Sequence, residues 1–240
     1  MKLATLATLG CSLIAAGSTM AAAVTPTYTT FGPLPGANFG GSGNPTDPVA
    51  ITTIQDGNNT ITLGLAAQQR YSNPPLANNG AGTFYATPGL NGGLVTPAKG
   101  LGATWNFDYY VNYTGSSTAG YTFKLFMGQD TASPSLFINP LHVGDNKPTA
   151  NNGGQNSENL SFAGFGNLGA FELNPLAGSF DANANADYSF VLKAYNAAGA
   201  EVGASAIVVS VAAVPDAGST ALLLGSALAG IGLIRRKMVA

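Results

Sequence analysis

The stretch Trp105-Asn106-Phe107-Asp108-Tyr109-Tyr110-Val111-Asn112-Tyr113-Thr114 is the clearest strand signal in the chain. Its odd-numbered positions are all aromatic or aliphatic, whereas the even-numbered ones are polar apart from Tyr110. A period of two is what a β-strand with one buried face requires. We therefore predict a strand over residues 105–114, and we place Trp105 in the core rather than in a binding site.

Similar alternation recurs on both sides of this stretch. Polar residues 115–120 reverse the chain into residues 121–127, so these two segments are expected to form an aromatic-rich hairpin. Residues 51–55 and 60–67 flank the turn cluster Asp56-Gly57-Asn58-Asn59 and should form a second hairpin. Residues 188–194 and 204–211, on either side of a turn at 196–199, should form a third.

The rest of this region is rich in Gly, Pro and Asn. Residues 24–46 read as an extended arm or loop, residues 71–101 as loop with at most one short strand at 83–86, and residues 128–187 as a long polar loop. Short strands, Gly/Asn turns and no amphipathic helix outside the termini predict an all-β protein. The expected architecture is an immunoglobulin-like or jelly-roll β-sandwich, with no choice between the two.

The N-terminus has the features of a secretory signal peptide. Lys2 supplies a positive charge, residues 3–16 are mostly apolar, and three alanines at 21–23 suit cleavage by signal peptidase. The chain's only cysteine, Cys11, lies inside this segment. We expect a signal peptide over 1–23, an exported domain over 24–213 without disulfides, and a separate C-terminal segment over 214–240.

That segment begins with Val214-Pro215-Asp216-Ala217-Gly218-Ser219-Thr220, continues through the uncharged residues 221–234 and ends with Arg235, Arg236 and Lys237. Fourteen helical residues span only about 21 Å of a hydrocarbon core near 30 Å. The segment is therefore expected to be a short transmembrane helix, with the basic stop in the cytoplasm and the main domain on the far side.

The order of motif, short helix and basic tail resembles the C-terminal sorting signal of PEP-CTERM proteins, in the variant that reads Val-Pro-Asp-Ser-Gly. The matching positions are Val214, Pro215, Asp216, Gly218, Ser219 and Thr220, whereas Ala217 stands where the family usually has serine. The resemblance implies recognition by an exosortase, a membrane protease-transpeptidase of Gram-negative bacteria that make exopolysaccharide. It also implies a membrane-anchored precursor and then a location at the cell surface or in the extracellular matrix.

Charge limits the possible partners. The chain carries eleven acidic and nine basic residues. One acid, Asp216, and four bases, Lys2, Arg235, Arg236 and Lys237, lie outside residues 24–213. Residues 24–213 therefore have ten acids and five bases, a net charge of −5. A chain with so few cations offers no basic surface for nucleic acid. A surface of amides, hydroxyls and glycine instead suits weak hydrogen bonding to polar neighbours such as polysaccharide.

Few residues are candidates for chemistry. Asp181, Asn183, Asn185 and Asp187 have the first spacings of a calcium loop, but the sixth and twelfth positions are Ala186 and Leu192, so an Asn/Asp-rich turn is the simpler interpretation. Residues 164–169 fit G-x-G-x-x-G outside any βαβ unit, and His142 is the only histidine. We therefore expect no catalytic site, cofactor or firmly bound metal.

The expected function is that of a non-catalytic surface or matrix protein associated with exopolysaccharide. The alternative is a carbohydrate-binding module with a defined groove, for which exposed aromatic residues are the discriminating feature. Tyr110 and Phe126 are the candidates for such exposed aromatics, because both fall on the polar phase of their strands.

Overall fold

The computed structural model describes residues 24–70, 75–91, 102–114, 120–130, 133–138, 149, 152–161 and 180–212. These residues form strands and contain no helix. The strands are β1 (Thr30–Gly32), β2 (Val49–Asp56), β3 (Asn59–Gln69), β4 (Ala77–Asn78), β5 (Thr83–Ala86), β6 (Leu90–Asn91), β7 (Gly102–Ala103), β8 (Trp105–Thr114), β9 (Thr122–Gln129), β10 (Ser135–Ile138), β11 (Asn152–Glu158), β12 (Ala186–Tyr195) and β13 (Glu201–Val211). The predicted signal peptide and C-terminal helix lie outside the described residues.

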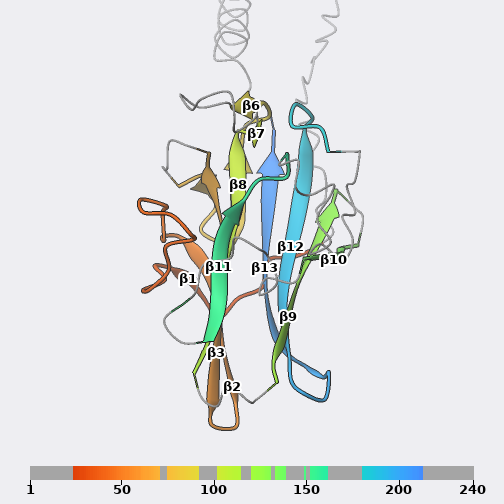
Figure 1. Ribbon diagram of the computed structural model, residues 1–240. Coiled ribbons are helices and arrows are strands. Elements are labelled where there is room, and N and C mark those ends of the chain that lie inside the picture. Colours follow the sequence, from red (N-terminus) through yellow and green to blue (C-terminus); the bar gives the residue numbers. More distant parts are fainter. Residues whose placement is uncertain are drawn as a thin grey trace, which may run out of the picture.

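Two sheets make up the body of the molecule (Figure 1). One has the strand order β1-β2-β3-β8-β11, and the other has the order β10-β9-β12-β13-β5-β4. Strands β6 and β7 form a small separate ladder at one end. Every pairing between strands is antiparallel except that of β13 with β5. The prediction of an all-β sandwich is confirmed.

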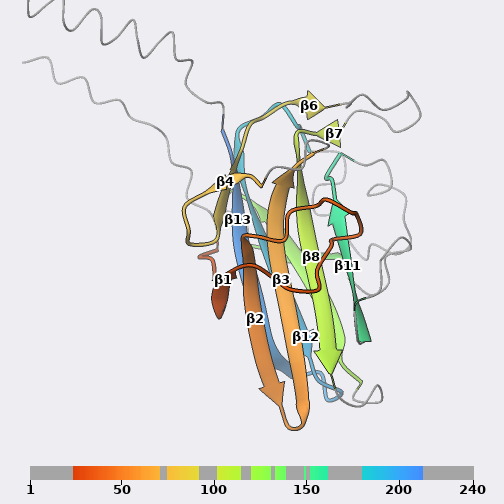
Figure 2. The same cartoon turned by 90° about the vertical axis from the view of Figure 1, so that its left-hand side faces the viewer.

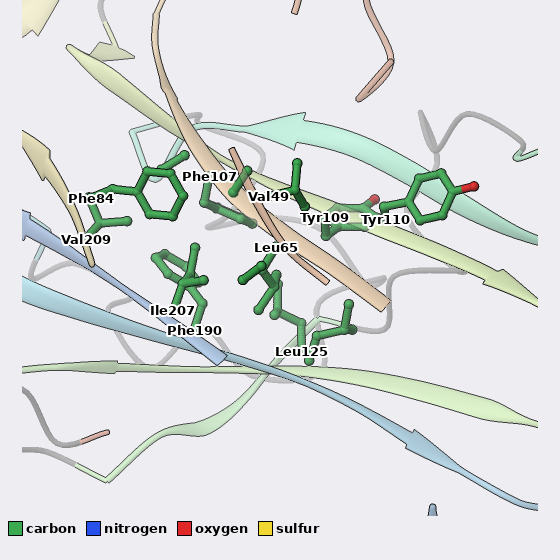
Figure 3. Close-up of a cluster of buried hydrophobic side chains, with 14 of the residues drawn as sticks. Val49, Leu65, Phe84, Phe107, Tyr109, Tyr110, Leu125, Phe190, Ile207 and Val209 are labelled. Carbon is green, nitrogen blue, oxygen red and sulfur yellow. The ribbon is translucent and has the colours of Figure 1, made fainter. Parts of the chain in front are cut away.

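Side chains from both sheets meet in one core (Figure 3). Phe107 and Leu65 come from the first sheet, and Phe190, Ile207 and Leu125 come from the second. The Phe107 and Phe190 rings stack with centroids 4.7 Å apart. Burying apolar area on this scale is the main stabilising contribution to a fold that lacks disulfides among its described residues.

Trp105 belongs to this core, as predicted. It is 2% exposed, and its ring lies 5.3 Å from Tyr188 and 6.3 Å from Phe190 between centroids. Tyr109 and Val111, on the same face of β8, are fully buried. The alternation in residues 105–114 therefore identified the buried face of this strand correctly.

Two of the three predicted hairpins are present. Strands β2 and β3 pair in antiparallel register from Ala50↔Leu65 to Asp56↔Asn59, so the turn consists of Gly57 and Asn58. Strands β12 and β13 pair from Ala186↔Val211 to Tyr195↔Glu201. The short strand at residues 83–86 is also present, as β5.

The predicted hairpin of residues 105–114 with 121–127 is wrong. Strand β8 pairs with β3 and β11, whereas β9 pairs with β10 and β12 in the opposite sheet. The chain crosses between the sheets here, and Tyr113 faces Tyr121 and Phe123 at centroid distances of 5.6 and 5.8 Å. Two strands with strongly aromatic faces bury more apolar area by facing each other across a sandwich than by lying side by side.

The predicted arm is more structured than expected. Residues 30–32 pair with β2 as an edge strand, and Thr27 exchanges two backbone hydrogen bonds with Ala206 of the second sheet. The chain between β1 and β2 then crosses the outer face of β3 and β8 (Figure 2). Gly64 permits this close approach, because a Cβ atom there would lie 2.7 Å from Leu34. The arm thus covers one face of the first sheet.

Candidate functional site

The outer face of the first sheet carries a cluster of polar side chains beneath this arm. Register places Gln68 opposite Asn106, and Ser157 opposite Asp108, so side chains from β3, β8 and β11 meet on one face. Gln68 is 2% exposed and Asp108 is fully buried. Buried polar groups of this kind are stable only when hydrogen bonds replace those lost to water.

A chain of hydrogen bonds joins the cluster. Asn159 Nδ2 donates to Asn106 Oδ1 at 2.8 Å, and Asn106 Nδ2 donates to Ser157 Oγ at 3.0 Å. Gln68 Nε2 donates to Ser157 Oγ at 2.7 Å and to Asp108 Oδ1 at 3.1 Å. The Asn106 and Gln68 amides therefore donate to Ser157 and Asp108, which form the accepting end of the network.

Asp108 is the only acidic residue of the cluster, and its carboxyl group has an altered pKa. Burial raises the pKa of Asp108 from 3.8 to about 7, although hydrogen bonds from Ser157 and Gln68 act in the opposite direction. Its Oδ2 atom has no hydrogen-bond partner in the part of the chain that the structure describes. A carboxyl group in this position changes its charge near neutral pH.

The Gln155 side chain hydrogen-bonds the arm to this face. Gln155 Oε1, on β11, accepts hydrogen bonds from the backbone N–H groups of Asn38 and Phe39 at 2.8 and 2.9 Å. Asn44 Nδ2 donates to the Phe39 carbonyl oxygen at 2.9 Å and closes the loop on itself. Phe39 is 1% exposed, so its ring is packed under the loop rather than presented to solvent.

A cavity of about 210 Å³ lies between this loop and the end of the first sheet. The loop contributes one wall, and strands β3, β8 and β11 with the residue after β3 contribute the rest. The cavity is lined by Phe39, Gly40, Gly41, Asn44, Gln68, Gln69, Arg70, Asn106, Asn156 and Ser157. Amide and hydroxyl groups thus predominate, and this cavity is the candidate site.

The sequence did not identify this cluster. The prediction of a long polar loop is wrong for residues 152–158, which form strand β11 and pair with β8 along the whole length of β11. The segment Asn-Gly-Gly-Gln-Asn-Ser-Glu has no apolar alternation, so the period-two signal was missing. Polar residues at the even positions 106 and 108 were the available signal, but they indicated a solvated face.

Tyr110 and Phe126, the two candidates for exposed aromatic residues, lie in different sheets, on β8 and β9. Tyr110 is 3% exposed, which corrects the prediction for this residue, because the arm lies over its face of β8 and Gly36 comes close to its hydroxyl group. Burial also raises the pKa of Tyr110. Phe126 is partly exposed on the other sheet, where the Lys193 ammonium lies 5.4 Å from its ring centroid.

The predicted calcium-like loop is an Asx turn in the structure. Asp181 Oδ1 accepts the Asn183 backbone N–H at 2.9 Å and the Asn183 side-chain amide at 3.3 Å. Asp187 is the second residue of β12, and its N–H donates to Asp130 Oδ1 at 3.0 Å. Among the described residues, no group of three or more His, Cys, Asp or Glu is placed to hold a metal ion. The motifs at 164–169 and His142 lie outside the described residues.

We expect the melting temperature of the protein to be unchanged by a calcium chelator or by a thiol reductant. Asp181 already uses its Oδ1 to cap a turn, and the only cysteine lies in the expected signal peptide. Thermal unfolding followed by circular dichroism, with and without each reagent, measures this. A fall of many degrees with the chelator would contradict the prediction and make Asp181, Asn183, Asn185 and Asp187 calcium ligands.

The remaining predicted functional residues belong to the C-terminal segment, which follows β13 directly and lies outside the described residues. This segment carries a C-terminal sorting signal of the PEP-CTERM kind, which indicates an exported protein. The particular signal is the VPDSG-CTERM motif, whose family model matches residues 213–238. It indicates a membrane-anchored precursor processed by an exosortase-like enzyme.

No curated protein and no solved structure matches the chain. In the described part of the chain, no helix has the length and apolarity needed to cross a membrane.

Proposed function

We propose that this chain is a non-catalytic exported protein that an exosortase-type system sorts to the cell surface or extracellular matrix, where it associates with exopolysaccharide. The observation that carries the proposal is the match of residues 213–238 to the VPDSG-CTERM motif. The body that is delivered is a β-sandwich of the immunoglobulin-like or jelly-roll kind. Signal peptidase would remove residues 1–23 before sorting.

The position of the motif supports this proposal. Strand β13 ends at Val211, two residues before the match begins, so the signal starts where the sandwich ends. Asp216 would then lie close to the membrane on the exported side, held outside the membrane by the rigid Pro215. A processing enzyme at that interface could cleave there and release the folded domain.

The character of the surface also supports a structural role. Among the described residues, Tyr85 and Leu90 are the large apolar side chains that are clearly exposed. The buried carboxyl groups Asp108 and Glu158 are engaged by amide side chains, Gln68 and Asn156. These contacts favour a packing role for the two acids over a catalytic one.

We expect the double substitution Pro215→Ala and Asp216→Ala to leave export intact but to trap the protein in the membrane with its tail attached. The motif would be lost, while the helix and the basic stop at Arg235 and Arg236 would remain. Fractionation of the producing cells into membrane, surface and medium, followed by mass spectrometry of the C-terminus, measures both effects. Asp181→Ala, which removes an acid from an exposed turn, is the matched control and should be processed normally.

Two results would contradict this proposal. The first is a mature wild-type protein that still carries Arg235 and Arg236 in cells that contain the processing enzyme. That result would leave a plain membrane anchor. The second is recovery of the processed protein from the medium alone, with none in the surface or exopolysaccharide fraction, which would refute the association but not the sorting.

A further inference from the structure

The chain contains three copies of a short pattern that none of the sites above uses. Asparagine, then any residue except proline, then serine or threonine is the acceptor pattern for N-linked glycosylation of exported proteins. The sequence has it at Asn58-Asn59-Thr60, Asn112-Tyr113-Thr114 and Asn159-Leu160-Ser161. So short a pattern also arises by chance, and the fold decides which of the three asparagines is able to carry a glycan.

The fold excludes Asn159. Its side chain is fully buried, and its Nδ2 atom donates to the carbonyl oxygens of Ala103 and Trp105 at 3.0 and 2.7 Å. Its Oδ1 atom accepts the Ala103 N–H at 2.9 Å. A glycan on this nitrogen would force the amide out of the interior and leave those backbone groups unpaired, which is destabilising.

Asn112 is also poorly placed for modification. It lies on β8 within the first sheet, where its backbone pairs with Thr62 of β3 on one side and with Gly153 of β11 on the other. The residue is half-buried. A glycan at this position would have to fit against the side chains of three adjacent strands.

Asn58 lies at the tip of a hairpin instead. It is exposed and belongs to the two-residue turn between β2 and β3, which the Asp56↔Asn59 pair closes. Gly57 adopts a φ of 61° in this turn, and a Cβ atom added to it would meet nothing within 4 Å. The tip of the hairpin therefore has room for a bulky group.

The residues on both sides of Asn58 extend the acceptor pattern. Asp56 stands two positions before it, whereas Tyr110 and Ser157 hold this position before the other two asparagines. Bacterial enzymes that glycosylate asparagine favour an acid there. On the other side, the Thr60 hydroxyl makes an exposed hydrogen bond within the same hairpin. Exposure and local sequence thus single out the same asparagine.

We propose that Asn58 is an N-glycosylation site, modified by a membrane oligosaccharyltransferase with a saccharide carried on a lipid diphosphate. The Asn58 Nδ2 atom attacks the anomeric carbon of that saccharide and forms an N–C bond. The C–O bond to the diphosphate breaks, the lipid diphosphate leaves with its electron pair, and Nδ2 loses one proton to solvent. This inference rests on the proposed export, but not on cleavage of the sorting signal or on the association with exopolysaccharide.

The position of the hairpin determines where the glycan points. A Cβ atom added to Gly203, near the start of β13, would lie 2.6 Å from Ile54, so the β2–β3 hairpin lies beside the start of that strand. In Figure 1 the hairpin is at one end of the sandwich and the arrowhead of β13 points to the other. At about 3.3 Å per residue, β13 spans roughly 35 Å between that end and Val211. A glycan on Asn58 therefore projects away from the membrane in the anchored precursor.

Peptide mapping by mass spectrometry of the protein purified from the producing cells tests the site. Trypsin cuts after Arg70 and Lys124, so the three patterns fall in different peptides. We expect an added saccharide mass on the peptide that ends at Arg70, and none on the peptides that contain Asn112 or Asn159. Electron-transfer fragmentation assigns the added mass to Asn58.

Substitutions at the hairpin tip identify the acceptor. Asn58→Gln keeps an amide but loses the pattern, and Thr60→Ala removes the hydroxyl, so each should abolish the added mass. Thr60→Ser keeps the hydroxyl and should retain it. Asn112→Gln removes another copy of the pattern and is the matched control, which should leave the modification of Asn58 unchanged. The melting temperature of each variant is measured in parallel.

Two outcomes would overturn this site. One is an unmodified Asn58 in exported wild-type protein, and the other is an added mass on the same peptide that persists in folded Asn58→Gln. Neither affects the sorting proposal, because export is read from the loss of residues 1–23 and processing from the C-terminus. A protein that keeps residues 1–23 would instead contradict the export, and with it this site.

Discussion

Trp105→Ala should lower the free energy of unfolding by about 3–5 kcal/mol, the range found when a large aromatic side chain is truncated in a core. The indole ring packs against Tyr188 and Phe190 from the opposite sheet, so its loss would leave a void between the two layers. Neighbouring side chains on β8 are fully buried and have little room to move into that space. Denaturant unfolding followed by far-ultraviolet circular dichroism measures the effect.

The matched control for this substitution is Tyr85→Ala. Tyr85 is 47% exposed on the short strand β5, and its removal should change stability by no more than about 0.5 kcal/mol. Trp105 is the only tryptophan of the chain, so wild-type fluorescence reports this site alone and should be blue-shifted. A near-wild-type stability for Trp105→Ala, or a red-shifted emission, would show that the ring is outside the core.

For Asp108→Asn, the free energy of unfolding should rise relative to that of wild type as the pH increases from 5 to 8. Burial raises the pKa of Asp108 from 3.8 to about 7 in the folded state, so the folded protein binds this proton more tightly than the unfolded chain does. The stability linked to the group is fully present below pH 3.8 and is lost as the pH rises through 7. The loss between pH 5 and pH 8 amounts to about 2–3 kcal/mol.

The asparagine variant has no charge to bury and therefore lacks this loss. Its Oδ1 atom can still accept from Gln68, and its amide nitrogen takes the place of Oδ2, which has no hydrogen-bond partner among the described residues. The measurement is the difference in the free energy of unfolding between variant and wild type at several pH values. A constant difference for Asp108→Asn would contradict the raised pKa.

Local alternation was a sound guide to which face of a strand is buried. It placed Trp105, Phe107 and Tyr109 in the core, and turn chemistry placed the β2–β3 and β12–β13 hairpins. Both signals are carried by residues within a few positions of one another. The same reasoning could not assign β8 and β9 to different sheets, because a strand's apolar face is equally satisfied by either arrangement until the partners are known.

The candidate site depended on contacts that are distant in sequence. Gln155 binds the loop at Asn38 and Phe39 across more than a hundred residues, and this contact lies over the face of the sheet that was expected to be solvated. Tyr110 is buried for the same reason, although its position on the polar phase of β8 indicated exposure. Strand β11 was not predicted because its residues are polar and show no alternation of apolar and polar side chains.

The sequence by itself determined the C-terminal sorting signal and the class of fold. A sorting signal is read as a linear motif, so Val214, Pro215 and Asp216 can be recognised without any knowledge of the domain before them, and period-two alternation is a local property of each strand. Only the tertiary structure decided that β8 and β9 lie in opposite sheets, that the arm covers Tyr110, and that Gln68, Asp108 and Ser157 form one buried cluster. Those features depend on which distant segments pack against one another and form hydrogen bonds with one another. The arrangement that is adopted is the one with the lowest free energy for the whole fold.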